Sequence, residues 1–478
     1  MKLENLNLTY DYLMLDNLFY DEVKPQGLKK PFLIDANEEL AKEIGIDLDE
    51  LKSDKFVDFV NGEFLPPHSR PFAMVYAGHQ FGFFVPRLGD GRAINLGKLN
   101  THNLQLKGSG ITKYSRDGDG RAVLRSSIRE YLMSEAMHHL GVPTTRALAL
   151  IGSNHRVYRG EWESGSITLR VSPSWIRFGS FEYFYYEKKY KHLEALLDFT
   201  IEESFSHLLD DEHRYIKMFE EVVEKTAKLF AKWMSIGFNH GVLNSDNTSI
   251  AGLTIDYGPF AFLDDYDPDF ICNHTDREGR YSFKNQPQIG YTNLTMLAMA
   301  LSPLINLDHM KEVLLNYENI FNDENLRLLR SKLGLQKEDK YDKNLIDELF
   351  SILKNQRIDY TYFFRTLSSY VGDREEILSI MLLKKPLEDW LDQYDKRLEI
   401  EKLDHNQRVE FMKKTNPKYI LKNYMLQEAI EKAESGDFSG VYELMLLAKA
   451  PYDEHPKFDR YSKPTPNEFK NLKLSCSS

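Results

Sequence analysis

The sequence predicts an α+β fold, because strand-like and helix-like periodicities occupy different parts of the chain. Residues 71–185 alternate strand patterns with one strong helix, and the segment 103–108 alternates apolar and polar residues as a strand does. Residues 186–240 have a helical pattern, with an apolar stripe along 215–230 that we assign to core packing. Residues 306–450 contain successive amphipathic helical patterns. A mixed region followed by helices is typical of an α+β protein.

Two terminal segments flank this pattern. In the first seventy residues, prolines mark extended or turn segments, and the last twenty-eight are polar and rich in proline. The expected divisions are an N-terminal leader (1–70), a mixed region (71–185), a helical region with a polar loop (186–305), a helical extension (306–450) and a C-terminal tail (451–478).

The composition is ordinary for a soluble globular protein. The chain has 478 residues, of which 42% are hydrophobic and 28% charged. It carries 61 basic and 73 acidic residues, a net charge of −12, which argues against broad nucleic-acid binding. No apolar run approaches the roughly 18–20 residues of a membrane helix, and the N-terminus lacks the apolar core of a signal peptide. We therefore expect a cytoplasmic protein without nucleic-acid or membrane partners.

A candidate metal site lies in the second half of the chain. Asp246 and Asn247 are adjacent, and Asp256 begins an Asp-Tyr-Gly turn nine residues after the asparagine. Two carboxylates and an amide supply the hard oxygen ligands that Mg²⁺ or Mn²⁺ prefers. The short spacing predicts that these side chains meet around a metal bound to a polyphosphate.

The same segment has the order of a protein-kinase metal loop. In kinases, an H-R-D-x-x-x-x-N motif is followed by D-F-G, and the Asn and the second Asp hold the metals. Aligned on His240 and Asn247, this chain keeps the His, the Asn and the Asp256-Tyr-Gly turn. Val242 stands where kinases have the catalytic Asp. The metal ligands are therefore present without the usual base.

The upstream half supplies the other parts of a nucleotide site. Gly89 and Gly91 form a glycine turn, where the backbone can approach phosphates and donate N–H bonds, with Arg92 beside it. Lys107 lies on a predicted strand, and Glu130 follows on a predicted helix. We expect Lys107 and Glu130 to form the ion pair that orients a phosphate-binding lysine.

Together these features predict a protein-kinase-like bilobal fold. Residues 71–185 would form the nucleotide-binding N-lobe and residues 186–305 the C-lobe with the metal site. The leader precedes the lobes, and the helical extension follows them. Each feature alone is weak, since a Gly-x-Gly turn, a strand lysine or an Asp-Tyr-Gly segment is common in unrelated proteins.

The arginines favour nucleotidyl transfer over phosphoryl transfer. Attack at the α-phosphorus releases pyrophosphate, and fixed cations must hold this leaving group. Guanidinium groups bind phosphate oxygens bidentately. Each arginine could instead be a surface or ion-pair residue. Arg125 and Arg129 share a predicted helix face with Arg121. We expect at least part of this row to be structural or to face the substrate. The candidate phosphate-binding arginines are Arg92, Arg121, Arg170 and Arg177.

Three functional classes remain open on these residues. The first is a metal-dependent protein nucleotidyltransferase, and the second is an atypical kinase of proteins or small molecules in which Asp246 replaces the missing base. The third is an inactive pseudokinase that binds nucleotide as a scaffold. The retained Lys107, Glu130, Asn247 and Asp256 argue against the third class. Val242 and the arginines argue against the second.

Five segments resemble the selenoprotein O family. The resemblance runs from roughly residue 70 to 300, and the cysteine-containing tail also fits. The segments are Tyr76-Ala-Gly-His-Gln-Phe-Gly, Leu104-Gln-Leu-Lys-Gly-Ser-Gly, the run from Tyr114 to Tyr131, Ile176-Arg-Phe-Gly-Ser-Phe-Glu and Asn239-His-Gly-Val-Leu-Asn-Ser-Asp-Asn.

The resemblance implies a pseudokinase fold that works as a protein adenylyltransferase. ATP would bind flipped relative to a kinase, and AMP would move to Ser, Thr or Tyr hydroxyls of proteins; bacterial members are also associated with UMP transfer from UTP with Mn²⁺. Carried over to this sequence, the metal ligands are Asn247 and Asp256. Asp246 is the proton acceptor, although it could equally orient Asn247 or a metal-bound water. The ATP-binding positions are Gly89, Gly91, Arg92, Lys107, Asp119, Gly120, Arg170 and Arg177.

The two cysteines give a further expectation. Cys272 follows the metal segment, and Cys476 lies near the C-terminus. They could be unrelated reduced thiols, as is usual in a cytoplasm. The selenoprotein O family, however, has a redox-active selenocysteine or cysteine near the C-terminus, which this tail resembles. We hypothesise a reversible Cys272–Cys476 disulfide that holds the tail and modulates substrate access.

Overall fold

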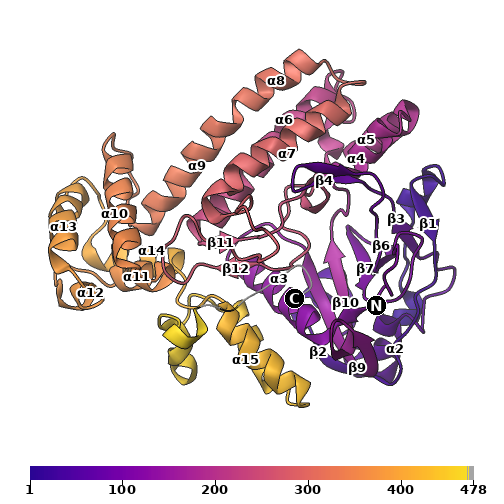
Figure 1. Cartoon of the computed structure of the whole chain (residues 1–478), viewed down its shortest axis with the longest axis horizontal. Coiled ribbons are helices and arrows are strands. Elements are labelled where there is room, and N and C mark those ends of the chain that lie inside the picture. The colour runs from indigo at the N-terminus through magenta and orange to yellow at the C-terminus, as the bar shows by residue number, and fades with distance from the viewer. Residues whose placement is uncertain (471, 473–478) are drawn as a thin grey trace.

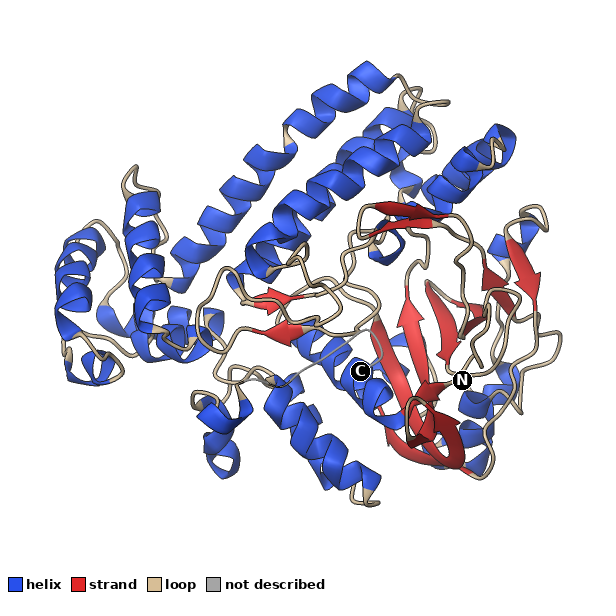
Figure 2. Cartoon of the chain, viewed as in Figure 1, coloured by secondary structure: helices blue, strands red, loops and turns tan. Residues whose placement is uncertain are grey.

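An antiparallel sheet and a set of helices confirm the α+β class (Figure 2). The computed structural model describes residues 1–470 and 472. Within these residues, eight strands form the main sheet in the order β1-β3-β6-β7-β10-β9-β2, and β8 pairs with β10. Their bounds are β1 (Tyr20–Glu22), β2 (Pro31–Ala36), β3 (Phe72–Met74), β6 (Ala93–Leu99), β7 (His102–Lys107), β8 (Ala122–Val123), β9 (Arg146–Tyr158) and β10 (Trp162–Ser172).

The two faces of this sheet have different chemistry, because side chains alternate along each strand. Leu104 and Leu106 point into an apolar cluster with α1 (Glu38–Ile44) and α2 (Asp54–Asn61). Gln105 and Lys107 therefore lie on the opposite face, and the strand register pairs Gln105 with Arg170 of β10. One face of the sheet thus forms a core, and the other carries polar groups.

The polar face is bordered by helix α3 (Leu124–His139). This helix is buried along most of its length, because β9 and β10 cover one side and α15 (Asn423–Glu434) and α16 (Ser439–Lys449) pack on another. Such burial explains why Glu130, at its centre, is only 2% exposed. The C-terminal helices therefore support the part of α3 that reaches the polar face.

The first 70 residues contribute two strands to the same sheet, since β1 pairs with β3 and β2 pairs with β9. At the other end of the chain, Lys470 forms an ion pair with Asp265, with N–O distances of 2.8 and 2.9 Å. Both terminal segments are thus attached to the centre of the molecule. The division of the chain into five parts stays a prediction.

A helical layer lies beside the sheet and forms a second core (Figure 1). Two short strand pairs lie between these layers. The hairpin of β4 (Gly78–Gln80) and β5 (Phe83–Val85) is one, and β11 (Phe238–Asn239) paired with β12 (Ala261–Phe262) is the other. The second pair closes residues 240–260 into a loop. The helices of this layer are α4 (Phe178–Tyr186), α5 (Tyr190–Ser204), α6 (Arg214–Ser235) and α7 (Gln286–Leu301).

Further helices follow along the chain, and α10 to α14 form the end of the molecule farthest from the sheet (Figure 1). No helix in the described ranges is long and apolar enough to cross a membrane. The remaining bounds are α8 (Leu307–Leu315), α9 (Tyr317–Lys332), α10 (Asp342–Gln356), α11 (Tyr360–Leu367), α12 (Glu375–Ser379), α13 (Lys384–Leu398) and α14 (His405–Thr415).

Trp390 anchors the core of this helical end. Its side chain is 1% exposed, and its indole N–H donates to the carbonyl of Leu345 at 2.8 Å. We expect Trp390→Ala to lower the free energy of unfolding by about 3–5 kcal/mol, because it leaves a cavity in a close-packed core. Trp162→Ala is the control, since Trp162 is 61% exposed. Urea denaturation followed by circular dichroism measures both; equal effects would contradict this account of the core.

Candidate functional site

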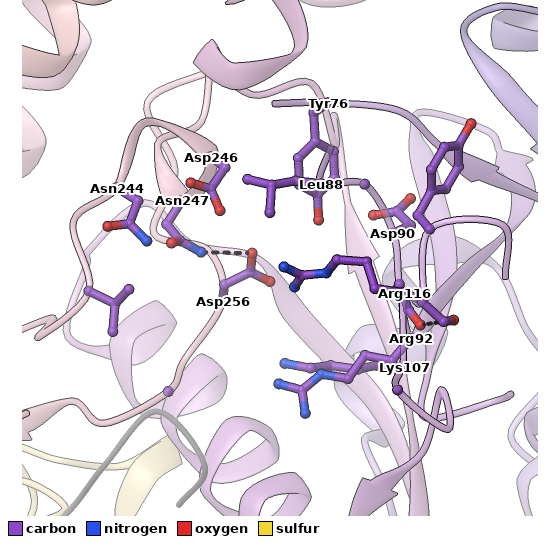
Figure 3. Close-up of a pocket in the computed structure, with 18 of the residues that line it drawn as sticks. Tyr76, Leu88, Asp90, Arg92, Lys107, Arg116, Asn244, Asp246, Asn247 and Asp256 are labelled. Carbon is purple, nitrogen blue, oxygen red and sulfur yellow. Dashed lines mark hydrogen bonds between the residues drawn. The ribbon is translucent and has the colours of Figure 1, made fainter. Parts of the chain in front are cut away.

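The sheet and the 240–260 loop enclose a cavity of about 580 Å³ (Figure 3). Its lining is strongly charged. Among the residues that the structure describes, seven cationic side chains and four carboxylates line it. The cations belong to Arg92, Lys107, Arg116, Arg121, Arg159, Arg170 and Arg177, and the carboxylates to Asp90, Asp119, Asp246 and Asp256. An excess of cations in a partly enclosed cavity favours a polyanionic ligand.

A ladder of buried amides crosses the sheet below this cavity. The Asn95 amide donates to a carboxylate oxygen of Asp90 at 3.1 Å, and the Gln105 amide donates to the Asn95 oxygen at 3.1 Å. Arg170 then donates to the Gln105 oxygen. Asp90 also accepts from the backbone N–H of Met74 at 3.0 Å. The ladder therefore links the glycine turn to Arg170.

Arg170 is the centre of a buried ion-pair network. Its Nη1 lies 3.0 Å from Glu130 Oε1 and 2.9 Å from Asp256 Oδ1. Glu130 Oε2 lies 2.6 Å from Lys107 Nζ, so the predicted Lys107–Glu130 pair is present. Burial would raise the pKa of Glu130, but Lys107 and Arg170 outweigh it and hold that pKa below its usual value. Burial lowers the pKa of Lys107 to about 8, and Glu130 opposes this shift.

Asp256 is held by two guanidinium groups. Arg170 pairs with one carboxylate oxygen and Arg177 with the other. Its backbone lies in the left-handed region with φ of 58°, a conformation that non-glycine residues adopt infrequently and Asp more than most. Burial alone would raise the pKa of Asp256, but Arg177 and Arg170 hold it well below its usual range. Asp256 is therefore ionised.

Asp246 has a different environment a short distance along the loop. Its Oδ2 accepts from the Gln80 amide at 3.0 Å, and its buried Oδ1 accepts no hydrogen bond from any described residue. Burial raises the pKa of Asp246 to about 7, although Gln80 and Arg177 lower it in part. The two aspartates of the loop thus differ in their affinity for a proton.

Two glycines that line the cavity are in close contact with neighbouring segments of the chain. A Cβ atom on Gly89, whose φ is 124°, would lie 2.5 Å from the ring of Tyr114. A Cβ atom on Gly120 would lie 2.0 Å from the carbonyl of Gly110. Only glycine fits at these two positions, so the backbone borders the cavity directly.

Asp119 and the two arginines of α3 have partners within the protein. Arg121 precedes β8 and lies outside α3, so the predicted helix face shared by Arg121, Arg125 and Arg129 is wrong. Both oxygens of Asp119 accept from Arg159, at 2.6 and 2.8 Å. Arg125 pairs with Glu163 at 2.6 Å. Arg129 donates to the carbonyl of Phe260 at 3.0 Å, a contact that joins α3 to the 240–260 loop.

The structure brings the predicted site residues together. All the predicted nucleotide and metal positions line the cavity, and Glu130 lies directly behind Lys107. Their individual roles stay predictions. Sequence reasoning did not assign functions to Tyr76, Gln80, Asp90, Arg116, Arg159 and Asn244, which also line it. Tyr76 and Gln80 lie in a segment that carried the family resemblance. Arg159 lies at the tip of the β9–β10 hairpin, where no sequence motif indicates a site.

The donor atoms of the loop fit a hard divalent cation. Asn247 and Asp256 are in contact, because the Asn247 amide donates to Asp256 Oδ2 at 3.2 Å (Figure 3). The unpartnered Oδ1 of Asp246 is a further carboxylate oxygen in the same loop. Carboxylate and amide oxygens suit Mg²⁺ or Mn²⁺.

The structure describes one of the two cysteines, Cys272. Cys272 is buried, with 4% of its surface exposed, and its Sγ lies 3.7 Å from the carbonyl oxygen of Asn239. Cys476 lies outside the described residues. The proposed Cys272–Cys476 disulfide therefore stays a hypothesis.

Comparisons with known proteins agree on one family. The family model described as Protein adenylyltransferase SelO matches residues 2–449. The chain is similar to the Protein nucleotidyltransferase YdiU of Vibrio cholerae, with 45% identity over 487 residues and 99% of each chain covered. The protein of the same name from Aliivibrio salmonicida is 44% identical over 480 residues, again with 99% of each chain covered. The one from Myxococcus xanthus is 43% identical over 485 residues, covering 100% of this chain and 99% of the relative.

Lys107 should contribute directly to the binding of a polyphosphate. We expect Lys107→Ala to weaken ATP binding by about 10- to 100-fold, because a buried charge-assisted contact contributes roughly 1.5–3 kcal/mol. Lys98→Ala is the matched control, since Lys98 lies on the neighbouring strand β6 and does not line the cavity. Isothermal titration calorimetry gives both affinities. Equal affinities in the two variants would exclude Lys107 from the binding site.

Proposed function

The chain belongs to the protein adenylyltransferase SelO family, and we propose that it transfers AMP from ATP to hydroxyl groups of protein substrates and releases pyrophosphate. The observation that carries this proposal is the cluster of Lys107, Arg170 and Arg177, which pair with Glu130 and Asp256, beside a second carboxylate on Asp246. This arrangement can hold a triphosphate and still leave a carboxylate for an acceptor hydroxyl.

The cationic groups suit a pyrophosphate leaving group. Arg170 and Arg177 are each 2% exposed and are held by carboxylates. Because their positions are set by the protein, little reorganisation is needed when negative charge develops on the leaving phosphates. Arg92 beside the glycine turn and Lys107 add charge on the sheet side. We assign these four residues and the backbone of Gly89 and Gly91 to the phosphates, and Asp119 and Gly120 to the rest of the nucleotide.

Asn247 and Asp256 would hold the metal, Mg²⁺ or Mn²⁺. When bound, the ion would neutralise phosphate charge and orient the triphosphate. Asp256 suits this role because it is ionised at neutral pH. Asn247 adds an amide oxygen without adding charge.

Asp246 is the group that we assign to the acceptor hydroxyl. It lines the cavity, and its carboxylate, unlike that of Asp256, is not paired with guanidinium groups. It would accept the proton of a Ser, Thr or Tyr hydroxyl as the oxygen attacks the α-phosphorus. Val242, at the position of the kinase base, also lines the cavity and cannot take a proton.

The arrangement of these groups supports a protein-kinase-like bilobal fold. In this proposal, residues 71–185 form the N-lobe and residues 186–305 the C-lobe. A strand lysine paired with a helix glutamate, and a metal loop that follows β11, are the features expected of that fold. We further propose that UTP can replace ATP, so that UMP is transferred when Mn²⁺ is present.

The bond that breaks can be identified with labelled ATP. We expect covalent label on protein from α-labelled ATP and none from γ-labelled ATP, together with a mass increase of one AMP. The reaction is run with Mg²⁺ and separately with Mn²⁺, and products are separated on denaturing gels. Label from the γ position alone would indicate a kinase, and no label with retained ATP binding would indicate an inactive nucleotide-binding scaffold.

Asp256→Asn separates nucleotide binding from transfer. We expect at least a 100-fold loss of AMP transfer, because the metal loses a charged ligand. ATP binding without metal should not weaken, because Arg170 and Arg177 lose a competing carboxylate. Asp269→Asn is the control, since Asp269 pairs with lysines at an exposed position. Calorimetry in EDTA and the α-label assay measure the two quantities; normal transfer by Asp256→Asn would contradict the proposed metal site.

A further inference from the structure

The β4–β5 hairpin is attached to the segment that carries Asp246. The backbone N–H of His79 donates to the Ser245 hydroxyl at 2.7 Å, and His79 Nδ1 lies 2.6 Å from the buried Glu182 carboxylate on α4. On the other side of Gln80, the backbone N–H of Phe81 donates to the Tyr281 hydroxyl at 2.9 Å. The residues on both sides of Gln80 are therefore fixed.

The turn of this hairpin has an unusual backbone. Phe81 and Gly82 have φ values of 51° and 87°, which is the pattern of a type I′ turn. A phenylalanine rarely adopts this conformation. Its ring packs on that of Tyr281 at 5.1 Å, and the Tyr281 hydroxyl donates to Asn244 at 2.6 Å. The strained residue is thus held by Tyr281, which is itself hydrogen-bonded to Asn244 of the loop that carries Asp246.

Gln80 contacts Asp246 from this fixed hairpin. Its amide nitrogen donates to Oδ2 at 3.0 Å. Gly78 of the same hairpin lies against the other oxygen, because a Cβ atom at Gly78 would be 2.6 Å from Oδ1. The hairpin therefore limits the rotation of the Asp246 carboxylate at both oxygens.

The chemistry of an amide suits this contact. A guanidinium or ammonium group would form an ion pair with Asp246, as two arginines do with Asp256. A neutral amide donates one hydrogen bond and leaves the carboxylate uncompensated by a formal charge. It can therefore orient a proton acceptor without blocking it.

We propose that Gln80 is the positioning residue for Asp246 in the transfer reaction. It holds the carboxylate in the orientation that faces an acceptor hydroxyl, and the β4–β5 hairpin holds Gln80. This inference rests on the proposed function, in which Asp246 takes the hydroxyl proton. Gln80 itself acts through Asp246 and transfers no proton.

The test is a double-mutant cycle in the full-length protein. Gln80→Met keeps the side-chain length and removes the donor. We expect kcat for AMP transfer to fall roughly tenfold to a hundredfold, as small misplacements of reacting groups do, while KM for ATP stays within about twofold. In an Asp246→Asn background, measured in long incubations with α-labelled ATP, Gln80→Met should cause no further loss.

Gln427→Met is the matched control, because the Gln427 amide donates to Glu431 at 2.9 Å on an exposed helix face. It should leave kcat unchanged. Gln80→Glu, a second variant of the same length, should lose activity as Gln80→Met does. Unchanged melting temperatures establish that the variants fold.

Three results would overturn the inference: wild-type kcat in Gln80→Met, a loss confined to KM for ATP, or an equal fold-loss in the Asp246→Asn background. If Asp246→Asn has no measurable rate, a crystal structure of Gln80→Met decides, since an unmoved Asp246 carboxylate overturns the inference and a displaced one supports it. α-Label transfer by the wild-type protein separates these results from a failure of the proposed function, which would show no such transfer.

Discussion

The site depends on the ion pairs of Arg170 with Glu130 and Asp256. One guanidinium joins a strand, a helix and the 240–260 loop, which approach one another from separate parts of the chain. Removing one member of a buried network leaves an uncompensated charge, which costs several kcal/mol. The ladder from Asp90 through Asn95 and Gln105 extends this constraint to the glycine turn. The two sides of the cavity are thus held by one continuous set of polar contacts.

The charge of the cavity lining explains how an acidic protein can bind a triphosphate. The net charge of the chain is −12, but the cavity has more cations than carboxylates. Global charge governs long-range association, whereas a partly enclosed site responds to the charges on its own walls. Exposed acidic residues elsewhere on the surface are largely screened by salt at distances beyond about 10 Å.

Asp246 and Asp256 show how one loop can give two carboxylates different properties. Two arginines hold the pKa of Asp256 well below its usual range, whereas burial raises that of Asp246 to about 7. Environments that separate the pKa values of neighbouring groups commonly separate their roles. In the proposed function, one carboxylate would hold the metal and the other would serve the acceptor.

The sequence by itself determined the α+β class, the Lys107–Glu130 pair and the predicted nucleotide and metal positions that line the cavity. Periodicity, the glycine turn and the short spacing of Asp246, Asn247 and Asp256 are local signals. The other positions were predicted from the order of the motifs along the chain and from the resemblance to a known family. The sequence did not indicate that the first 70 residues complete the sheet, that Arg159 holds Asp119, or that Gln80 contacts Asp246. Gln80 and Asp246 are 166 residues apart, and no local pattern encodes a contact of that kind. Only the tertiary structure decided these pairings, because they arise when strands and loops from distant parts of the chain pack against one another.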